Sequence, residues 1–382
     1  MLARHTQSAL ATPLRSLARG MASYEQSSRP PRFGNGPATP RPHNGRPPPH
    51  LLTLADLSPE QISELLLSSL TYKHLCKAFS AQVVRTSLKG KTVAMLFNKR
   101  STRTRVASET ATSVLGGNAM FLGGADIQLG VNESLRDTAQ VIGSMADGFM
   151  ARVGDHREIE ELAQYSSVPV VNALSYLWHP TQILADLLTL YEAYAPPLDL
   201  KEGAYHRGQV QTDLAKFIRT RVDPLSVLKG KKIAWVGDMN NIVWELMATV
   251  PRLGMEMSVA TPAGYDKVDD AVMARLKGHG IDRSITFTNS PKEALHNADV
   301  VVTDTWISMG MEAEKEERMK AFQGYQVTNE MVESAGAKAD WKFLHCLPRK
   351  PEEVDDEVFY GPRSLVFPEA ENRKWTTIGV FE

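Results

Sequence analysis

A group of hydroxyl and guanidinium side chains at residues 101–105 is the segment best suited to bind an anion. It lies between an apolar, β-branched run at 91–97 and a run with one apolar helical face. A strand that leads into a helix leaves unpaired N–H groups at the positive end of the helix dipole, where phosphate binds readily. The alternative is a helix-capping serine beside solvated arginines, but cations at a helix N-terminus oppose the dipole. We therefore expect phosphate to contact Ser101, Thr102, Arg103 and Thr104.

Other chemically capable residues follow later apolar runs. His179 and Gln182 are three residues apart, so on a helix they would point to the same side. An imidazole N–H and a glutamine oxygen together suit a small planar group with one acceptor and one NH₂ donor. Asp304 offers a carboxylate to an ammonium group, and the amides of Asn172 and Asn241 could bind an α-carboxylate. These residues could therefore bind a ligand that carries both an ammonium and a carboxylate group.

The expected elements alternate between strands and helices. The predicted strands are 91–97, 119–122, 148–153, 168–173, 232–238, 256–261, 298–304 and 342–346, and the predicted helices include 104–115, 134–145 and 179–194. Such alternation predicts parallel sheets covered by helices. The expected fold is therefore α/β, with two domains, each a parallel sheet covered by helices, joined by the long helix at 179–194. Ligands of such sheets bind beyond the carboxyl ends of the strands.

The composition fits an ordinary globular protein of two domains. The chain has 382 residues, 42% of them hydrophobic, and a formal net charge of −1, which gives no attraction to nucleic acid or anionic membranes. Its two cysteines, Cys76 and Cys346, are far apart in the sequence, which argues against a disulfide framework and a cysteine zinc site. No apolar run approaches the 18–20 residues or so that would cross a bilayer.

The first 50 residues differ from the rest. Residues 1–24 contain three arginines, several Ser and Ala and no acidic residue before Glu25, as mitochondrial transit peptides do; a disordered tail is the alternative. Residues 25–50 are rich in Pro, Gly, Arg and Asn and are interpreted as a disordered linker. The folded part should begin near Leu51.

Taken together and in this order, the motifs resemble those of the aspartate/ornithine carbamoyltransferase family, on its ornithine side. They are Ser-Thr-Arg-Thr at 101–104, His-Pro-Thr-Gln at 179–182, Asp-Met-Asn-Asn at 238–241, Ser-Met-Gly at 308–310, His-Cys-Leu-Pro at 345–348 and Glu-Ala-Glu-Asn-Arg at 369–373. The resemblance runs from about Leu51 to the end of the chain. It implies transfer of a carbamoyl group from carbamoyl phosphate to the δ-amine of L-ornithine, which gives L-citrulline and phosphate. It also implies a location in the mitochondrial matrix, a role in arginine biosynthesis, and a reaction that needs no metal or organic cofactor.

The resemblance assigns roles residue by residue. Carbamoyl phosphate would be bound by Ser101, Thr102, Arg103, Thr104, Gln128, Arg152, His179, Gln182, Cys346, Leu347 and Arg373. Ornithine would be bound by Asn172, Asn241, Asp304, Ser308 and Met309. Catalysis would fall to Cys346, Asp304, Arg103 and His179, with the acceptor of the amine proton left open between Asp304 and Cys346. A homotrimer is implied, in which Gln128 reaches the carbamoyl phosphate of a neighbouring subunit.

The resemblance also suggests domain limits. A carbamoyl phosphate domain is expected at 51–190, an ornithine domain at 191–350, and a C-terminal segment returning to the first domain at 351–382. Residues 195–229 form a longer polar connection than the family usually has and are interpreted as a surface insertion. The chain also ends nine residues after Arg373, where the family continues into a helix packed on the first domain, so we expect that helix to be abbreviated or missing.

Several alternatives remain at this stage. Aspartate carbamoyltransferases share the first two motifs but lack Ser-Met-Gly and His-Cys-Leu-Pro. A transferase for an acylated ornithine is harder to dismiss, and a noncatalytic protein of the same fold would not need Arg103, His179, Asp304 and Arg373 intact. The turn at 237–240 lacks the further glycines that a dinucleotide pyrophosphate requires, which argues against NAD.

Overall fold

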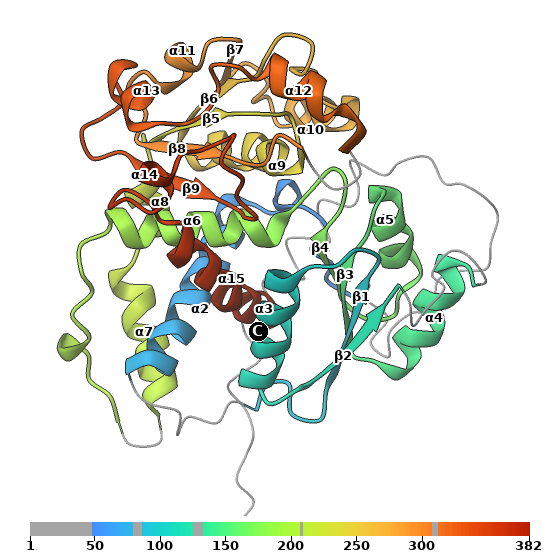
Figure 1. Ribbon diagram of the computed structural model, residues 1–382. Helices are drawn as coiled ribbons and strands as arrows, with labels where there is room; N and C mark the ends of the chain where they lie inside the picture. The colour runs from blue at the N-terminus through green and yellow to red at the C-terminus, as the bar shows by residue number, and fades with distance from the viewer. Residues whose placement is uncertain (1–47, 79–85, 125–132, 207–208, 308–311) are drawn as a thin grey trace, which may run out of the picture.

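Two parallel sheets with helices on their faces make up the protein (Figure 1). The computed structural model describes residues 48–78, 86–124, 133–206, 209–307 and 312–382. The expected transit peptide and most of the expected linker lie outside the described residues, as do Gln128, Ser308 and Met309. The predicted fold class, two helix-covered parallel sheets, is confirmed.

The first sheet has the strand order β2-β1-β3-β4, with every pairing parallel. Its strands lie within two residues of their predicted limits and are β1 (Thr92–Phe97), β2 (Asn118–Gly123), β3 (Gly148–Arg152) and β4 (Val170–Leu174). Five of the six residues of β1 are buried, as expected of a strand covered on both faces. The accompanying helices are η1 (Leu54–Asp56), α2 (Pro59–Ala78), α3 (Thr102–Val114), α4 (Leu135–Met145) and α5 (His156–Tyr165).

The second sheet has the order β7-β6-β5-β8-β9, also parallel throughout. Its strands are β5 (Lys232–Val236), β6 (Glu256–Ala260), β7 (Ile285–Thr288), β8 (Val300–Thr303) and β9 (Lys342–His345). The sequence missed β7, because this edge strand is short and exposes Thr286 and Phe287 instead of forming a continuous apolar run.

Short helices connect and cover these strands. They are η2 (Leu200–Glu202), α7 (Val210–Arg221), α8 (Pro224–Leu228), α9 (Asn241–Thr249), η3 (Val250–Leu253), α10 (Asp270–Gly278), α11 (Pro291–Leu295), η4 (Glu312–Glu314), α12 (Lys315–Ala321), α13 (Asn329–Ser334) and α14 (Asp356–Phe359). Among the described helices, none is long and apolar enough to span a membrane.

Helix α6 (Pro180–Tyr194) crosses between the two sheets (Figure 1). All residues from Pro180 to Tyr191 are buried, which is the expected state of a helix that is apolar on every side. Pro180 stands at the first helical position, where its missing N–H costs nothing. The N-terminal end of this helix presents His179 to the region between the sheets.

The interpretation of residues 195–229 as a surface insertion is wrong. Helix α7 packs on α2 and helix α8 packs on α6. Leu214, Ile218 and Leu228 are fully buried and belong to the main hydrophobic core. The spacing of Leu214, Ile218 and Val222 at intervals of four was the available signal for this amphipathic helix.

A long C-terminal helix, α15 (Val366–Phe381), packs against α2, α3 and α6. Trp375 and Ile378 are buried in this contact, and a Cβ atom at Gly379 would lie only 2.3 Å from Ser69 Oγ of α2. A glycine is therefore needed for this close approach. The expectation that this helix is abbreviated or missing is therefore wrong, since α15 has 16 residues, includes Arg373 and packs on helices of the first domain.

Candidate active site

The N-terminus of α3 presents the predicted anion-binding residues. Ser101 is the N-cap residue, but its hydroxyl makes no capping hydrogen bond. Thr102 is exposed, Arg103 is half-buried and Thr104 is buried. The capping alternative for Ser101 therefore has no support here, and the hydroxyl, the first-turn N–H groups and Arg103 can all serve an anion.

Three arginines from different elements surround His179. Burial lowers the pKa of His179 well below its usual value, and the charges of Arg373, Arg152 and Arg103 lower it further. The imidazole is therefore neutral near pH 7. Burial also lowers the pKa of Arg152 to about 10, with a contribution from Arg103, and burial lowers that of Arg373 to about 10. Positively charged guanidinium groups that repel one another in this way are stabilised by an anion bound between them.

The hydrogen bonds around His179 favour one tautomer of its ring. Nδ1 lies 3.5 Å from Thr181 Oγ1, and that hydroxyl oxygen also accepts from Arg373 Nη2 at 3.1 Å. In the arrangement in which the hydroxyl oxygen accepts from Arg373 and its proton is donated to Nδ1, both groups are satisfied. Nε2 then carries the hydrogen and can donate to a substrate oxygen.

Gln182 lies in a buried network rather than free in a cleft. Its Oε1 accepts from Arg373 Nη1 at 2.6 Å, and its Nε2 donates to Asp186 at 2.9 Å and to Glu369 at 2.7 Å. Burial raises the pKa of Asp186 to about 7 and, together with Asp186, raises that of Glu369 well above its usual value. These two carboxyl groups therefore retain a proton between them at neutral pH.

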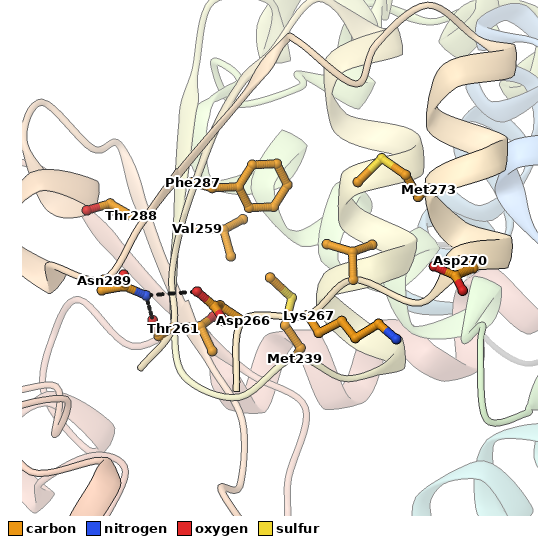
Figure 2. A pocket seen from close by; sticks show the side chains of 11 residues that line it. Met239, Val259, Thr261, Asp266, Lys267, Asp270, Met273, Phe287, Thr288 and Asn289 are labelled. Atoms are coloured by element: carbon orange, nitrogen blue, oxygen red, sulfur yellow. Dashed lines mark hydrogen bonds between the residues drawn. The ribbon is translucent and has the colours of Figure 1, made fainter. Parts of the chain in front are cut away.

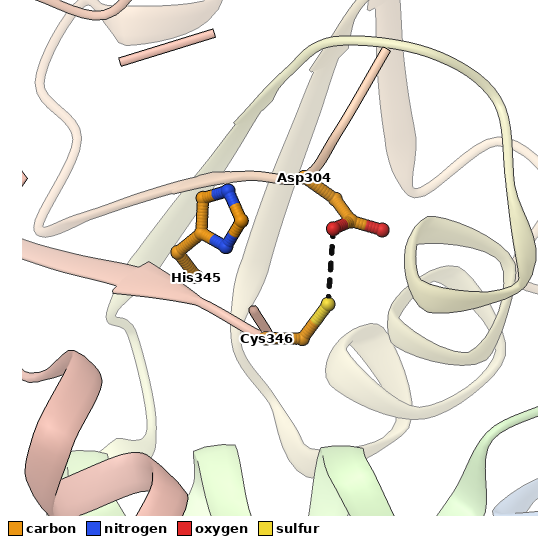
Figure 3. A group of neighbouring side chains, drawn as sticks. All are labelled: Asp304, His345 and Cys346. Carbon is orange, nitrogen blue, oxygen red and sulfur yellow. Dashed lines mark hydrogen bonds between the residues drawn. The ribbon is translucent and has the colours of Figure 1, made fainter. Parts of the chain in front are cut away.

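Asp304 and Cys346 lie next to each other, just beyond the ends of β8 and β9 in the second sheet (Figure 3). Cys346 Sγ donates to Asp304 Oδ1 at 3.1 Å, and Asn240 Nδ2 donates to Oδ2 at 2.9 Å. Burial, followed by the Asp304 carboxylate, raises the pKa of the thiol well above its usual value. The thiol is thus protonated at neutral pH and donates its hydrogen to the Asp304 carboxylate.

The turn after β9 joins the two halves of the site. Leu347 has a φ of 62°, in the left-handed region that non-glycine residues rarely adopt, and its carbonyl accepts from Arg103 Nη2. His345 Nδ1 accepts from the Leu347 N–H at 2.9 Å, and its Nε2 lies 3.3 Å from buried Glu353. Glu353 thereby holds the tautomer of His345 that supports Leu347.

Asp304, His345 and Cys346 also bring one oxygen, one nitrogen and one sulfur atom within 4.8 Å (Figure 3). The thiol donates its proton to Asp304, and both nitrogens of His345 already have partners. A metal would have to displace these contacts, so we assign none to this group.

The two predicted asparagines make contacts within the protein. Asn172 is buried, and its Nδ2 donates to Leu52 O at 2.8 Å and Ser175 Oγ at 3.1 Å. Asn241 Nδ2 donates to Ser175 O at 2.7 Å. Asn172 Oδ1 has no hydrogen-bond partner among the described residues. Their assignment to ornithine stays a prediction.

Several residues of the site escaped sequence analysis. Asp186 follows Gln182 by four residues and is an isolated acid in an apolar helix, which was a usable signal. Glu369 and Asn240 lie inside motifs that were recognised, but no pattern reveals that they contact Gln182 and Asp304. Glu353 gave no signal, since its role depends on its distance from His345 in the fold.

A separate cavity of about 460 Å³ lies at the carboxyl ends of β5, β6 and β7 (Figure 2). Met239, Val259, Met273 and Phe287 give it apolar walls, and Asp266 bonds to Asn289 at its edge. None of the predicted site residues lines it.

Comparison with known proteins follows the division seen in the structure. The family model for the carbamoyl-P binding domain of aspartate/ornithine carbamoyltransferases matches residues 49–192, and the model for their Asp/Orn binding domain matches residues 229–382. The chain belongs to the aspartate/ornithine carbamoyltransferase family.

The individual proteins that this chain resembles and that are described below are all named ornithine carbamoyltransferase. The chain is 46% identical over 372 residues to "Ornithine carbamoyltransferase, mitochondrial" of Emericella nidulans, which covers 96% of this chain and 94% of that protein. It is 47% identical over 339 residues to the protein of the same name from Aspergillus terreus, with 88% of each chain covered. The crystal structure of a mitochondrial ornithine carbamoyltransferase from Coccidioides immitis is 44% identical, with a TM-score of 0.73 and coverage of 87% of this chain and 96% of that one.

Proposed function

We propose that this protein transfers the carbamoyl group of carbamoyl phosphate to the δ-amine of L-ornithine, giving L-citrulline and phosphate. The observation that carries the proposal is the convergence of Arg103, Arg152 and Arg373 on a neutral His179, opposite the pair of Asp304 and Cys346. The first group suits a phosphorylated acyl donor, and the second suits an amine. The names of the similar proteins support the same reaction.

On the donor side, the arginines hold the phosphate and His179 holds the carbonyl oxygen. Arg103 can bind two phosphate oxygens with its planar fork, and the N-terminus of α3 adds N–H groups. The neutral His179 donates from Nε2 to the carbamoyl oxygen and stabilises the negative charge that develops there. A well-aimed donor of this kind contributes about 3–4 kcal/mol to the transition state.

On the acceptor side, the free base of the δ-amine attacks the carbamoyl carbon. A C–N bond forms, a tetrahedral intermediate results, and the bond from carbon to the phosphate oxygen then breaks, with its electron pair leaving on phosphate. An alkyl amine has a pKa near 10.4 and is mostly protonated at neutral pH, so the site must favour the neutral form. Because the Cys346 thiol keeps its own proton, we assign the proton released by the amine to Asp304.

Carbamoyl phosphate binding is proposed for residues 51–190 and ornithine binding for residues 191–350. Segment 351–382 is proposed to complete the first domain through Arg373.

For residues outside the described ranges, we propose that Gln128 binds carbamoyl phosphate and that Ser308 and Met309 bind ornithine. We also propose a homotrimer, which light scattering of the purified protein would test.

A mitochondrial matrix location is proposed from two observations. Curated relatives carry the word mitochondrial in their names. The first 24 residues have the arginine-rich, acid-free composition of a transit peptide. Fusion of this segment to a fluorescent protein would test import.

Citrulline formation by the purified protein tests the proposed function. The protein would be supplied with carbamoyl phosphate and, in separate reactions, with ornithine, N-acetylornithine or aspartate. We expect citrulline from ornithine and a kcat/KM for the other two acceptors at least about a hundredfold lower, since N-acetylornithine lacks the α-ammonium group and aspartate lacks the δ-amine. Preference for N-acetylornithine would support the acylated-substrate alternative, and absence of product would support the noncatalytic one.

A further inference from the structure

Helix α9 of the second domain holds the loop that presents His179. The loop runs from Ser175 to His179, between β4 and α6. Asn241, in the first turn of α9, donates to Ser175 O at 2.7 Å. The ring of Trp244 meets the ring of Tyr176 edge-on at 5.5 Å between centroids. The loop is therefore attached to α9 near its beginning and in its middle.

Glu245 makes the third and most specific contact. It lies four residues after Asn241, on the same side of α9, and is fully buried. Its Oε2 accepts from the backbone N–H of His179 at 2.9 Å. Its Oε1 accepts from the N–H of Leu54 at 2.6 Å and from the hydroxyl of Thr53 at 2.8 Å. One carboxylate thus joins the N-cap residue of α6 to the segment just before α2.

A carboxyl group can satisfy this set of donors, whereas a carboxamide cannot. Burial raises the pKa of Glu245 to about 8, against the opposing effect of its hydrogen bonds with Thr53, Leu54 and His179. When the group holds a proton it can donate that proton to the Thr53 hydroxyl oxygen, and each N–H group still faces an oxygen atom. The N–H groups of His179 and Leu54 reach different oxygens, and neither can act as an acceptor. A glutamine at this position would turn its NH₂ group toward one of the two N–H groups and leave that N–H buried without a partner. Such a buried, unsatisfied group is costly, so the loop would shift to relieve it.

We infer that Glu245 is a positioning residue for carbamoyl transfer, which sets the place of the His179 ring from the second domain. The inference rests on the proposed function, because it assigns to His179 the carbonyl oxygen of the donor. Glu245 itself does not contact the reacting atoms. It acts through the backbone of His179, so its removal should slow the chemical step more than it weakens ornithine binding.

The test compares Glu245→Gln with a matched control in the same region. Asp56→Asn is the control, since Asp56 pairs with Arg275 of α10 at 2.7 Å and so also joins this segment to the second domain, without touching His179. We expect kcat to fall at least about tenfold in Glu245→Gln, with KM for ornithine changed less than about threefold. The reason is that the displaced His179 ring would no longer donate well to the oxygen that becomes negative in the transition state. We expect Asp56→Asn to keep kcat within about twofold of the wild type. Equal kcat values in all three proteins, or equal losses in the two variants, would overturn the inference.

Two further measurements keep the inference testable if Glu245→Gln does not fold. Glu245→Asp keeps the carboxyl group but withdraws it by one methylene, so it cannot reach both N–H groups, and it should also lower kcat. In the wild-type protein, amide hydrogen exchange should show the His179 N–H to be strongly protected. Full kcat in Glu245→Asp or fast exchange at His179 would contradict the inference. If the wild-type protein forms no citrulline, the proposed function fails, while the exchange measurement still tests the Glu245 contact.

Discussion

The two sides of the candidate site are built in different ways. On the donor side, the local sequence brings most of the residues together, because a strand leads into a helix and Ser101 to Thr104 follow one another along the chain. On the acceptor side, Asp304 and Cys346 lie just beyond the ends of β8 and β9, and Asn240, the N-cap residue of α9, donates to Asp304. A local motif is visible in a sequence, whereas a site assembled from several strand ends is visible only in the fold.

The comparison predicts that the largest single effect lies on the donor side. Arg103→Ala removes the proposed charge-assisted contact to phosphate, a kind of contact worth about 1.5–3 kcal/mol, and it also removes the bond to the Leu347 carbonyl. We expect kcat/KM to fall by about a hundredfold with every acceptor. Steady-state kinetics with two acceptors would measure this, and an activity loss confined to ornithine would contradict the assignment.

On the acceptor side, Asp304→Asn should act selectively. The amide cannot offer a negative charge to the amine, and it turns an NH₂ group toward either the Cys346 thiol or Asn240. We expect kcat to fall, because the amide cannot accept the amine proton, and KM for ornithine to rise about tenfold, with KM for carbamoyl phosphate changed less than about threefold. Equal changes in both KM values would mean that Asp304 is structural.

The different construction of the two sides also explains what the sequence could predict. The parallel strands, α6 and the residues at 101–104 follow from continuous apolar runs and from a helix N-terminus, which are local patterns. Helix α7 and strand β7 were missed, because tertiary packing decides the burial of a short polar segment. The pairing of Asp186 with Glu369 spans 183 residues of sequence, and no local pattern encodes it.

That buried pair gives a prediction on pH dependence. The pKa of Asp186 is raised from 3.8 to about 7 by burial, so between these values the folded protein binds more protons than the unfolded chain. Stability therefore falls as pH rises toward 7, by up to about 1.4 kcal/mol per pH unit from this group. In Asp186→Asn we expect a flatter dependence of the free energy of unfolding between pH 5 and 7. Urea denaturation at several pH values would measure it, and parallel curves for the two proteins would contradict the prediction.

The smallest expected effect separates binding from helix capping. Ser101 makes no capping bond, whereas Thr328 caps α13 by accepting from Met331 N at 3.1 Å. Ser101→Ala should weaken carbamoyl phosphate binding a few-fold without changing the melting temperature. Thr328→Ala should lower stability by about 1 kcal/mol without changing that binding. Thermal denaturation and calorimetry on both variants would measure stability and binding. A lower melting temperature in Ser101→Ala with unchanged carbamoyl phosphate binding would refute the role given to Ser101.

Calorimetric titration of both ligands into Arg103→Ala and Asp304→Asn tests the division of the site most directly. Carbamoyl phosphate would be titrated alone, and ornithine in the presence of saturating inorganic phosphate, so that no reaction occurs. We expect a crossed result, in which Arg103→Ala loses affinity for carbamoyl phosphate and Asp304→Asn loses affinity for ornithine. Unchanged carbamoyl phosphate binding in Arg103→Ala, or equal losses of both ligands in Asp304→Asn, would contradict it.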